Sequence, residues 1–120
     1  MKAVCHCGAV ELEVTLLDGL KTAQRCDCSF CRRRAAPAVV ARKEDLKVTK
    51  GAEALTLYQW GSQTARHHFC KYCGIYMYHN QRANPEHVGV NLGSLKGVNP
   101  AEHEPIPWSD GVKHPSDRKS

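Results

Sequence analysis

Hydrophobic and polar residues alternate most regularly near the start of the chain. Over residues 10–16, aliphatic side chains occupy every even position, and glutamate or threonine separates them. This period of two is typical of a strand with one buried face. The Asp18-Gly19 pair that follows favours a turn. We therefore expect the first strand at residues 10–16.

Other short runs of aliphatic, aromatic and β-branched residues continue this pattern. They predict strands at 22–25, 38–41, 46–49, 55–60, 66–69, 75–79 and 87–92. Glycines and Asn-Pro pairs separate most of these runs at hairpin-like intervals. No long segment keeps a helical period, although residues 29–34 and 42–45 can each form one helical turn. The pattern predicts a mainly β protein with antiparallel strands.

The C-terminal part of the chain has a different character, because it is irregular and rich in proline from Glu104 onward. We expect residues 104–120 to form an extended arm with a loose end at 116–120. With 120 residues, 42% hydrophobic and 24% charged, the chain has the size and composition of a single small domain over residues 1–120. The core of such a domain is modest, so additional cross-links would stabilise it.

Seven cysteines can supply such cross-links, and an odd number cannot all pair in intramolecular disulfides. The first residues also contain no apolar stretch long enough for a signal peptide or a membrane span. We therefore expect a cytoplasmic protein with reduced thiols and no membrane association. The cysteines form three clusters: Cys5 and Cys7; Cys26, Cys28 and Cys31; Cys70 and Cys73.

The spacing within each cluster is typical of metal ligands, because the intervening residues can turn and bring the sulfurs to one side. Gly8 and Gly74 follow the outer clusters and ease that turn. A structural zinc site has four ligands, whereas a catalytic one typically has three and an open position. We therefore expect two zinc ions per chain. The outer clusters form the structural site, and the middle cluster forms the catalytic site.

The cysteine clusters allow two alternatives. The first concerns the middle cluster. A fourth protein ligand from Asp27, His67, His68 or His79 would make both sites structural. Cysteine clusters also hold iron–sulfur centres, which would give a coloured protein. In addition, His103 and His114 lie in the arm, from which they could approach an open metal position.

Arginines surround the middle cluster: Arg25 precedes it, and Arg32, Arg33 and Arg34 follow it. Three thiolates on one zinc ion leave a net negative charge, which guanidinium groups would offset. The same groups can bind substrate carboxylates, so Arg32, Arg33 and Arg34 are candidate substrate-binding residues. Alternatively, they form the basic surface of a non-enzymatic zinc-binding interaction module.

The formal charge of +5 normally suggests an anionic partner such as nucleic acid. Two zinc ions add four positive charges and seven thiolates add seven negative ones, which lowers this charge to about +2. Many of the basic residues therefore offset the negative charge of the metal sites. This makes nucleic acid a less favoured partner. The sequence does not specify an oligomeric state.

The order of the motifs resembles the glutathione-dependent formaldehyde-activating enzyme (Gfa) family, which shares its domain with centromere protein V. The resemblance implies a β-tent fold of small antiparallel sheets, a structural zinc on the outer cysteines and a catalytic zinc on the middle three. It also implies a small-molecule thiol partner, glutathione in the family's defining reaction, and carbon–sulfur lyase chemistry that forms or cleaves S-hydroxymethylglutathione. The matching residues are Cys5-His6-Cys7-Gly8, Cys26-Asp27-Cys28-Ser29-Phe30-Cys31-Arg32-Arg33, Tyr58, Arg66 and Phe69-Cys70-Lys71-Tyr72-Cys73-Gly74.

Overall fold

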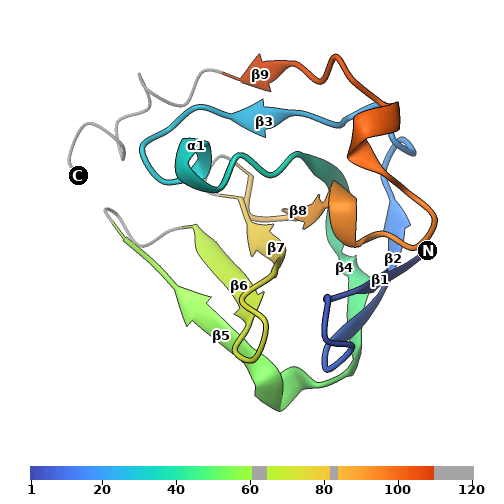
Figure 1. Cartoon of the computed structure of the whole chain (residues 1–120), viewed down its shortest axis with the longest axis vertical. Helices are drawn as coiled ribbons and strands as arrows, with labels where there is room; N and C mark the ends of the chain where they lie inside the picture. Colours follow the sequence, from blue (N-terminus) through green and yellow to red (C-terminus); the bar gives the residue numbers. More distant parts are fainter. Residues whose placement is uncertain (61–64, 82–83, 110–120) are drawn as a thin grey trace.

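The largest element of the computed structural model is one antiparallel sheet (Figure 1). The structure describes residues 1–60, 65–81 and 84–109. Seven strands lie in the order β1-β2-β4-β8-β7-β6-β5. The prediction of a mainly β protein is confirmed. In chain order the strands are β1 Lys2–Val4, β2 Glu11–Leu16, β4 Ala38–Lys50, β5 Leu55–Tyr58, β6 Arg66–Cys70, β7 Tyr76–Asn80 and β8 His87–Asn91.

A second, two-stranded sheet lies at the top of the view in Figure 1. Its strands, β3 (Arg25–Cys26) and β9 (Trp108–Ser109), are parallel. The helix α1 (Cys31–Arg34) is a single turn, and the 3-10 turns are η1 (Ala52–Ala54), η2 (Leu92–Ser94) and η3 (Pro100–Glu102). Within the described residues, no helix has the length and apolar character needed to cross a membrane.

The predicted strands largely coincide with the observed ones, with three differences. The strands expected at 38–41 and 46–49 are the single strand β4, and the helical turn expected at 42–45 is wrong. The register between β2 and β4 shifts between Val14 and Leu16, so residues 42–45 are accommodated by a bulge. The strand expected at 22–25 is reduced to β3, whereas β1 was not predicted. The turn expected at 29–34 is confirmed as α1.

The core lies against the large sheet, as the alternation in residues 10–16 predicts. Leu12 and Val14 are 0% and 1% exposed, whereas Glu13 and Thr15 between and beside them are exposed. The buried cluster also contains Cys5 and Cys70. The hydrophobic core therefore extends to two of the outer cysteines and anchors them.

Topology places these two cysteines near opposite ends of the large sheet. Cys5 follows the edge strand β1, and Cys70 ends β6, which neighbours the other edge strand β5. In Figure 1 the loop after β1 and the loop between β6 and β7 face each other across the lower part of the molecule. The sheet must curve for the two loops to approach each other.

Candidate metal centres and the adjoining pocket

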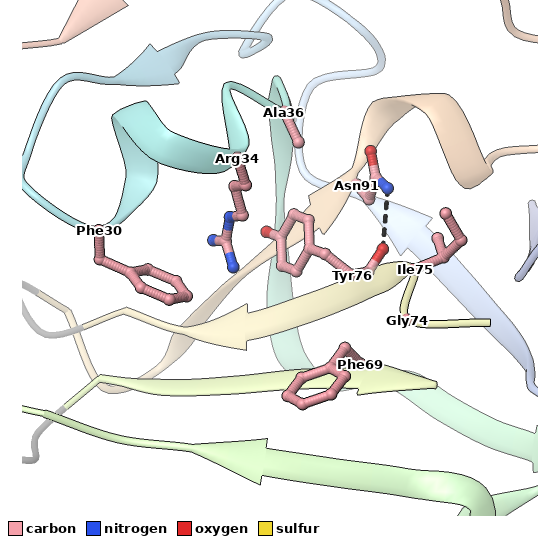
Figure 2. Close-up of a pocket in the computed structure, with 8 residues that line it drawn as sticks. All are labelled: Phe30, Arg34, Ala36, Phe69, Gly74, Ile75, Tyr76 and Asn91. Carbon is pink, nitrogen blue, oxygen red and sulfur yellow. Dashed lines mark hydrogen bonds between the residues drawn. The ribbon is translucent and has the colours of Figure 1, made fainter. Parts of the chain in front are cut away.

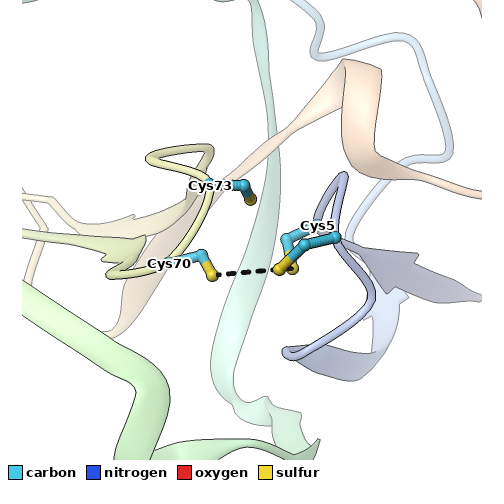
Figure 3. Close-up of side chains that lie close together, drawn as sticks. Cys5, Cys70 and Cys73 are labelled. Atoms are coloured by element: carbon cyan, nitrogen blue, oxygen red, sulfur yellow. Dashed lines mark hydrogen bonds between the residues drawn. The ribbon is translucent and has the colours of Figure 1, made fainter.

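The four outer cysteines come together where the two loops meet (Figure 3). Their sulfurs all lie within 4.8 Å of one another. The Sγ of Cys7 is 3.6 Å from that of Cys5 and 3.7 Å from that of Cys70. A tetrahedral zinc ion with Zn–S bonds of about 2.3 Å separates its sulfurs by about 3.8 Å. The donor set and its spacing therefore fit a four-thiolate zinc site.

Tight turns give the outer cysteines this arrangement. Gly8 and Gly74 have φ angles of 82° and 76°, which non-glycine residues rarely adopt. The amide of Gly8 donates to the carbonyl of Cys5, and the amide of Gly74 donates to that of Cys70. The amide of Val10 donates to the Sγ of Cys5 over 3.3 Å, which stabilises a thiolate there. The glycines identified from the sequence thus occupy the positions where the chain must turn.

The middle cluster spans the end of β3, the loop that follows and the first residue of α1. The sulfurs of Cys26, Cys28 and Cys31 are within 4.8 Å of one another, and the amide of Cys31 donates to the Sγ of Cys28 over 3.3 Å. Within the described part of the chain, no histidine, aspartate or glutamate joins these three sulfurs at that mutual distance. Asp27, His67, His68 and His79 therefore do not supply a fourth ligand in this geometry.

The three middle thiols compete for protons. Hydrogen bonds from Cys26 and Cys31 lower the pKa of Cys28, whereas interactions with Cys26 and Cys28 raise the pKa of Cys31. Adjacent thiolates repel one another, so one ionises at the expense of its neighbours. A divalent cation removes this conflict, since it lets all three sulfurs be thiolates. The two cysteine clusters can therefore each bind a metal ion, and both are compatible with zinc.

The C-terminal arm holds the loop of the middle cluster in place. The Arg25 guanidinium makes two contacts of 2.8 and 3.2 Å with the Glu104 carboxylate, and its Nε donates to the carbonyl of Ala35. The amide of Asp27 donates to the carbonyl of Ser109. Arg25 therefore pairs with a carboxylate rather than offsetting the negative charge of the cysteine cluster. The loose end predicted at 116–120 lies outside the described residues.

The three consecutive arginines point in different directions. Arg32 and Arg33 are exposed, and Arg33 donates to the carbonyl of Ser29 within its own turn. Arg34 is half-buried, and its Nη2 lies 3.9 Å from the Sγ of Cys31. The structure therefore brings one of the three predicted substrate-binding residues next to the middle cluster and leaves the other two in solvent.

Arg34 also lines a pocket of about 410 Å³ (Figure 2). Its guanidinium carbon lies 3.6 Å from the ring centre of Tyr76 and 4.8 Å from that of Phe30. Sequence reasoning did not identify the other lining residues, because Tyr76 and Phe69 are indistinguishable from core aromatic residues in a strand pattern. The lining residues are Phe30, Arg34, Ala36, Phe69, Gly74, Ile75, Tyr76 and Asn91.

His79, on the same strand β7, contacts the hydroxyl group of Tyr76. The Oη of Tyr76 is 2.6 Å from the Nδ1 of His79 and donates to the carbonyl of Gly89 over 3.2 Å. Both contacts are satisfied together when the phenol donates to Gly89 and the Nδ1–H tautomer of His79 donates to the phenol oxygen. Burial, with a smaller effect of Arg34, lowers the pKa of His79 to about 3. His79 is therefore neutral at physiological pH.

The remaining histidines lie in varied surroundings. His67 is buried, and its ring centre lies 4.4 Å from that of Phe30 and 5.3 Å from that of His79. His6 and His103 are exposed. His114, which the sequence placed in the arm, lies outside the described residues. None of the histidines within the described ranges completes either cysteine cluster.

Together, the curved antiparallel sheet and the two thiol clusters define a small β protein with two candidate zinc sites. The chain belongs to the glutathione-dependent formaldehyde-activating enzyme family, whose model matches residues 1–107. The crystal structure of a Rhodobacter sphaeroides protein, a Northeast Structural Genomics target, is similar with 60% identity and a TM-score of 0.90. That match covers 91% of this chain and 100% of the other. Membership of this family supports a function related to glutathione or formaldehyde in general.

Proposed function

We propose that this protein is a zinc-dependent carbon–sulfur lyase of the Gfa type, which forms or cleaves a thiol–aldehyde adduct such as S-hydroxymethylglutathione. The observation that carries the proposal is the middle cluster. Cys26, Cys28 and Cys31 present three sulfurs within 4.8 Å of one another, and no described acidic or histidine side chain completes the set. Three ligands and an open position are typical of a catalytic zinc site.

The two clusters have different roles in this proposal. Cys5, Cys7, Cys70 and Cys73 hold a structural zinc that joins the two ends of the large sheet. Cys26, Cys28 and Cys31 hold the catalytic zinc. A zinc ion at this second site supplies a Lewis acid that lowers the pKa of a bound thiol, and its thiolate ligands make it suited to sulfur.

The reaction conserves all atoms of the two reactants. The thiol loses its proton, its sulfur bonds to the aldehyde carbon, and the carbonyl electron pair moves to the oxygen, which takes up a proton. Arg34, 3.9 Å from the Sγ of Cys31, offsets the negative charge that accumulates at the thiolates. The rings of Phe30 and Tyr76 flank the guanidinium of Arg34 and hold it next to the cluster.

Metal content and exchange kinetics test the proposal together. The purified protein should contain two zinc ions per chain and accelerate exchange between a thiol and formaldehyde, as followed by exchange NMR. Cys28→Ala should retain one zinc ion, keep the wild-type circular dichroism spectrum and lose the acceleration. Cys70→Ala, as the matched change in the outer cluster, should lose cooperative unfolding instead, because structural zinc contributes on the order of 10 kcal/mol to folding. A zinc-loaded wild type without acceleration for any thiol would overturn the proposal.

A further inference from the structure

Arg34 carries a charge that the described part of the protein does not neutralise with a carboxylate. The ion pairs among the described residues are those of the N-terminus with Glu13 and of Arg25 with Glu104. The Nε of Arg34 is buried and has no hydrogen-bond partner among the described residues. Two aromatic rings and the Sγ of Cys31 surround the guanidinium instead. Besides offsetting charge at the cluster, a guanidinium in this position can pair with an anionic ligand.

The remainder of the pocket is apolar. Phe30, Phe69 and Ile75 contribute hydrophobic side chains, and no acidic residue and no second cation is among the residues that line it. The Asn91 amide is engaged, since it donates to the carbonyl of Tyr76 over 2.8 Å. In Figure 2, Arg34 lies between Phe30 and Tyr76, and Ile75 and Asn91 lie on the far side of Tyr76. The pocket thus has one charged group next to an apolar surface.

We infer that this pocket selects thiols that combine one carboxylate with an apolar body. The inference rests on the proposed thiol–aldehyde chemistry and names the class of thiol that it uses. The carboxylate pairs with Arg34, and the apolar body packs against Phe69 and Ile75. A volume of about 410 Å³ accommodates a small molecule of this kind.

The position of Arg34 also limits the distance between the two functional groups of the ligand. Its Nη2 is 3.9 Å from the Sγ of Cys31, so the bound carboxylate lies close to the cysteine cluster. A mercapto acid with its thiol and carboxylate on the same or adjacent carbons meets this requirement. Glutathione separates its thiol from each of its two carboxylates by a peptide linkage, and its ammonium group would find no acidic partner in the lining. A mercapto acid therefore fits the lining better than this zwitterionic peptide.

Calorimetric titration of the zinc-loaded protein with three thiols tests the inference. The probes are 2-mercapto-3-phenylpropionate, its methyl ester and glutathione. Because the acid and the ester share the thiol and the phenyl group, the difference between their affinities isolates the carboxylate. We expect the acid to bind at least about 10-fold more tightly than either of the others, as a charge-assisted pair in a partly buried site permits.

Variants of Arg34 connect this preference to its side chain. Arg34→Gln should bind the acid and the ester equally, and Arg34→Lys should retain part of the preference. Arg42→Gln removes the same charge from an exposed position on β4 and should leave the preference unchanged. Equal binding of glutathione and the acid by the wild type would overturn the inference, as would an undiminished preference in Arg34→Gln.

Rates of exchange between formaldehyde and the same thiols distinguish this inference from the proposed function. If exchange with formaldehyde is fastest for glutathione, the lyase proposal stands and the inference is wrong. If the acid binds selectively but no thiol exchanges faster than in buffer, the ligand class stands and the lyase proposal is wrong.

Discussion

Replacing Gly89 by alanine tests how closely β8 packs against the His79 side chain of β7. Gly89 lies opposite His79 in the register of the two strands. A Cβ atom at position 89 would lie 2.4 Å from the Cε1 of His79 and 3.0 Å from both ring nitrogens. Carbon atoms in contact normally remain about 3.5 Å apart, so the imidazole would have to move by about 1 Å.

The cost follows from what this movement breaks. The His79 side chain is partly buried and its Nδ1 is only 2.6 Å from the Oη of Tyr76, so the ring cannot retreat and keep this hydrogen bond. Overpacking a core typically costs about 1–3 kcal/mol, and loss of one hydrogen bond adds about 1 kcal/mol. We therefore expect Gly89→Ala to lower the free energy of unfolding by about 2–4 kcal/mol.

A double-mutant cycle isolates the contact between the two residues. In a His79→Ala background the added methyl group enters vacated space, so Gly89→Ala should cost close to nothing there. Urea denaturation at a fixed zinc concentration measures all four proteins. Gly93→Ala serves as the matched control, because its added Cβ would lie 3.5 Å from the nearest atom, an ordinary contact, and Gly93 is exposed.

Two results would refute this reasoning. One is a Gly89→Ala protein as stable as Gly93→Ala, which would mean that the ring moves without cost. The other is an equal loss of stability in the presence and absence of the His79 ring, which would place the conflict elsewhere.

Two further predictions concern pH. The pKa of Glu104 is lowered, chiefly by its contact with Arg25, so the pair stabilises the fold above about pH 4.5 and is lost as the pH falls through the lower folded value. Glu104→Gln should therefore lower the urea midpoint more at pH 7 than at acidic pH, whereas the exposed Glu102→Gln should change neither midpoint. A loss that does not shrink as the pH falls would contradict the assignment. Burial lowers the pKa of His79 from 6.5 to about 3. Between these values the unfolded chain binds a proton that the folded chain does not. The contribution of His79 to stability is therefore complete above pH 6.5 and declines as the pH falls toward 3. NMR of the imidazole should show His79 neutral at pH 5. A titration midpoint near pH 6.5 would show that its pKa is not lowered.

Local patterns in the sequence anticipated much of the fold. The alternation in residues 10–16 identified β2, because a strand with one buried face requires apolar residues at every second position. The same pattern could not join 38–41 to 46–49, since the bulge that carries 42–45 depends on pairing with β2. Strand β1 has only three residues, too few to show a period.

The sequence by itself also determined the chemistry of the candidate sites. Cysteine spacing and the glycines after the outer pairs reflect local turns, so the clusters and the family could be recognised without coordinates. The cysteine count also led us to join the two outer clusters in one site, and the structure brings their four sulfurs within 4.8 Å of one another. Other contacts between distant segments were beyond the reach of the sequence. Only the tertiary structure paired Arg25 with Glu104 and turned Arg34 alone toward the pocket, because packing between segments far apart in the chain decides both.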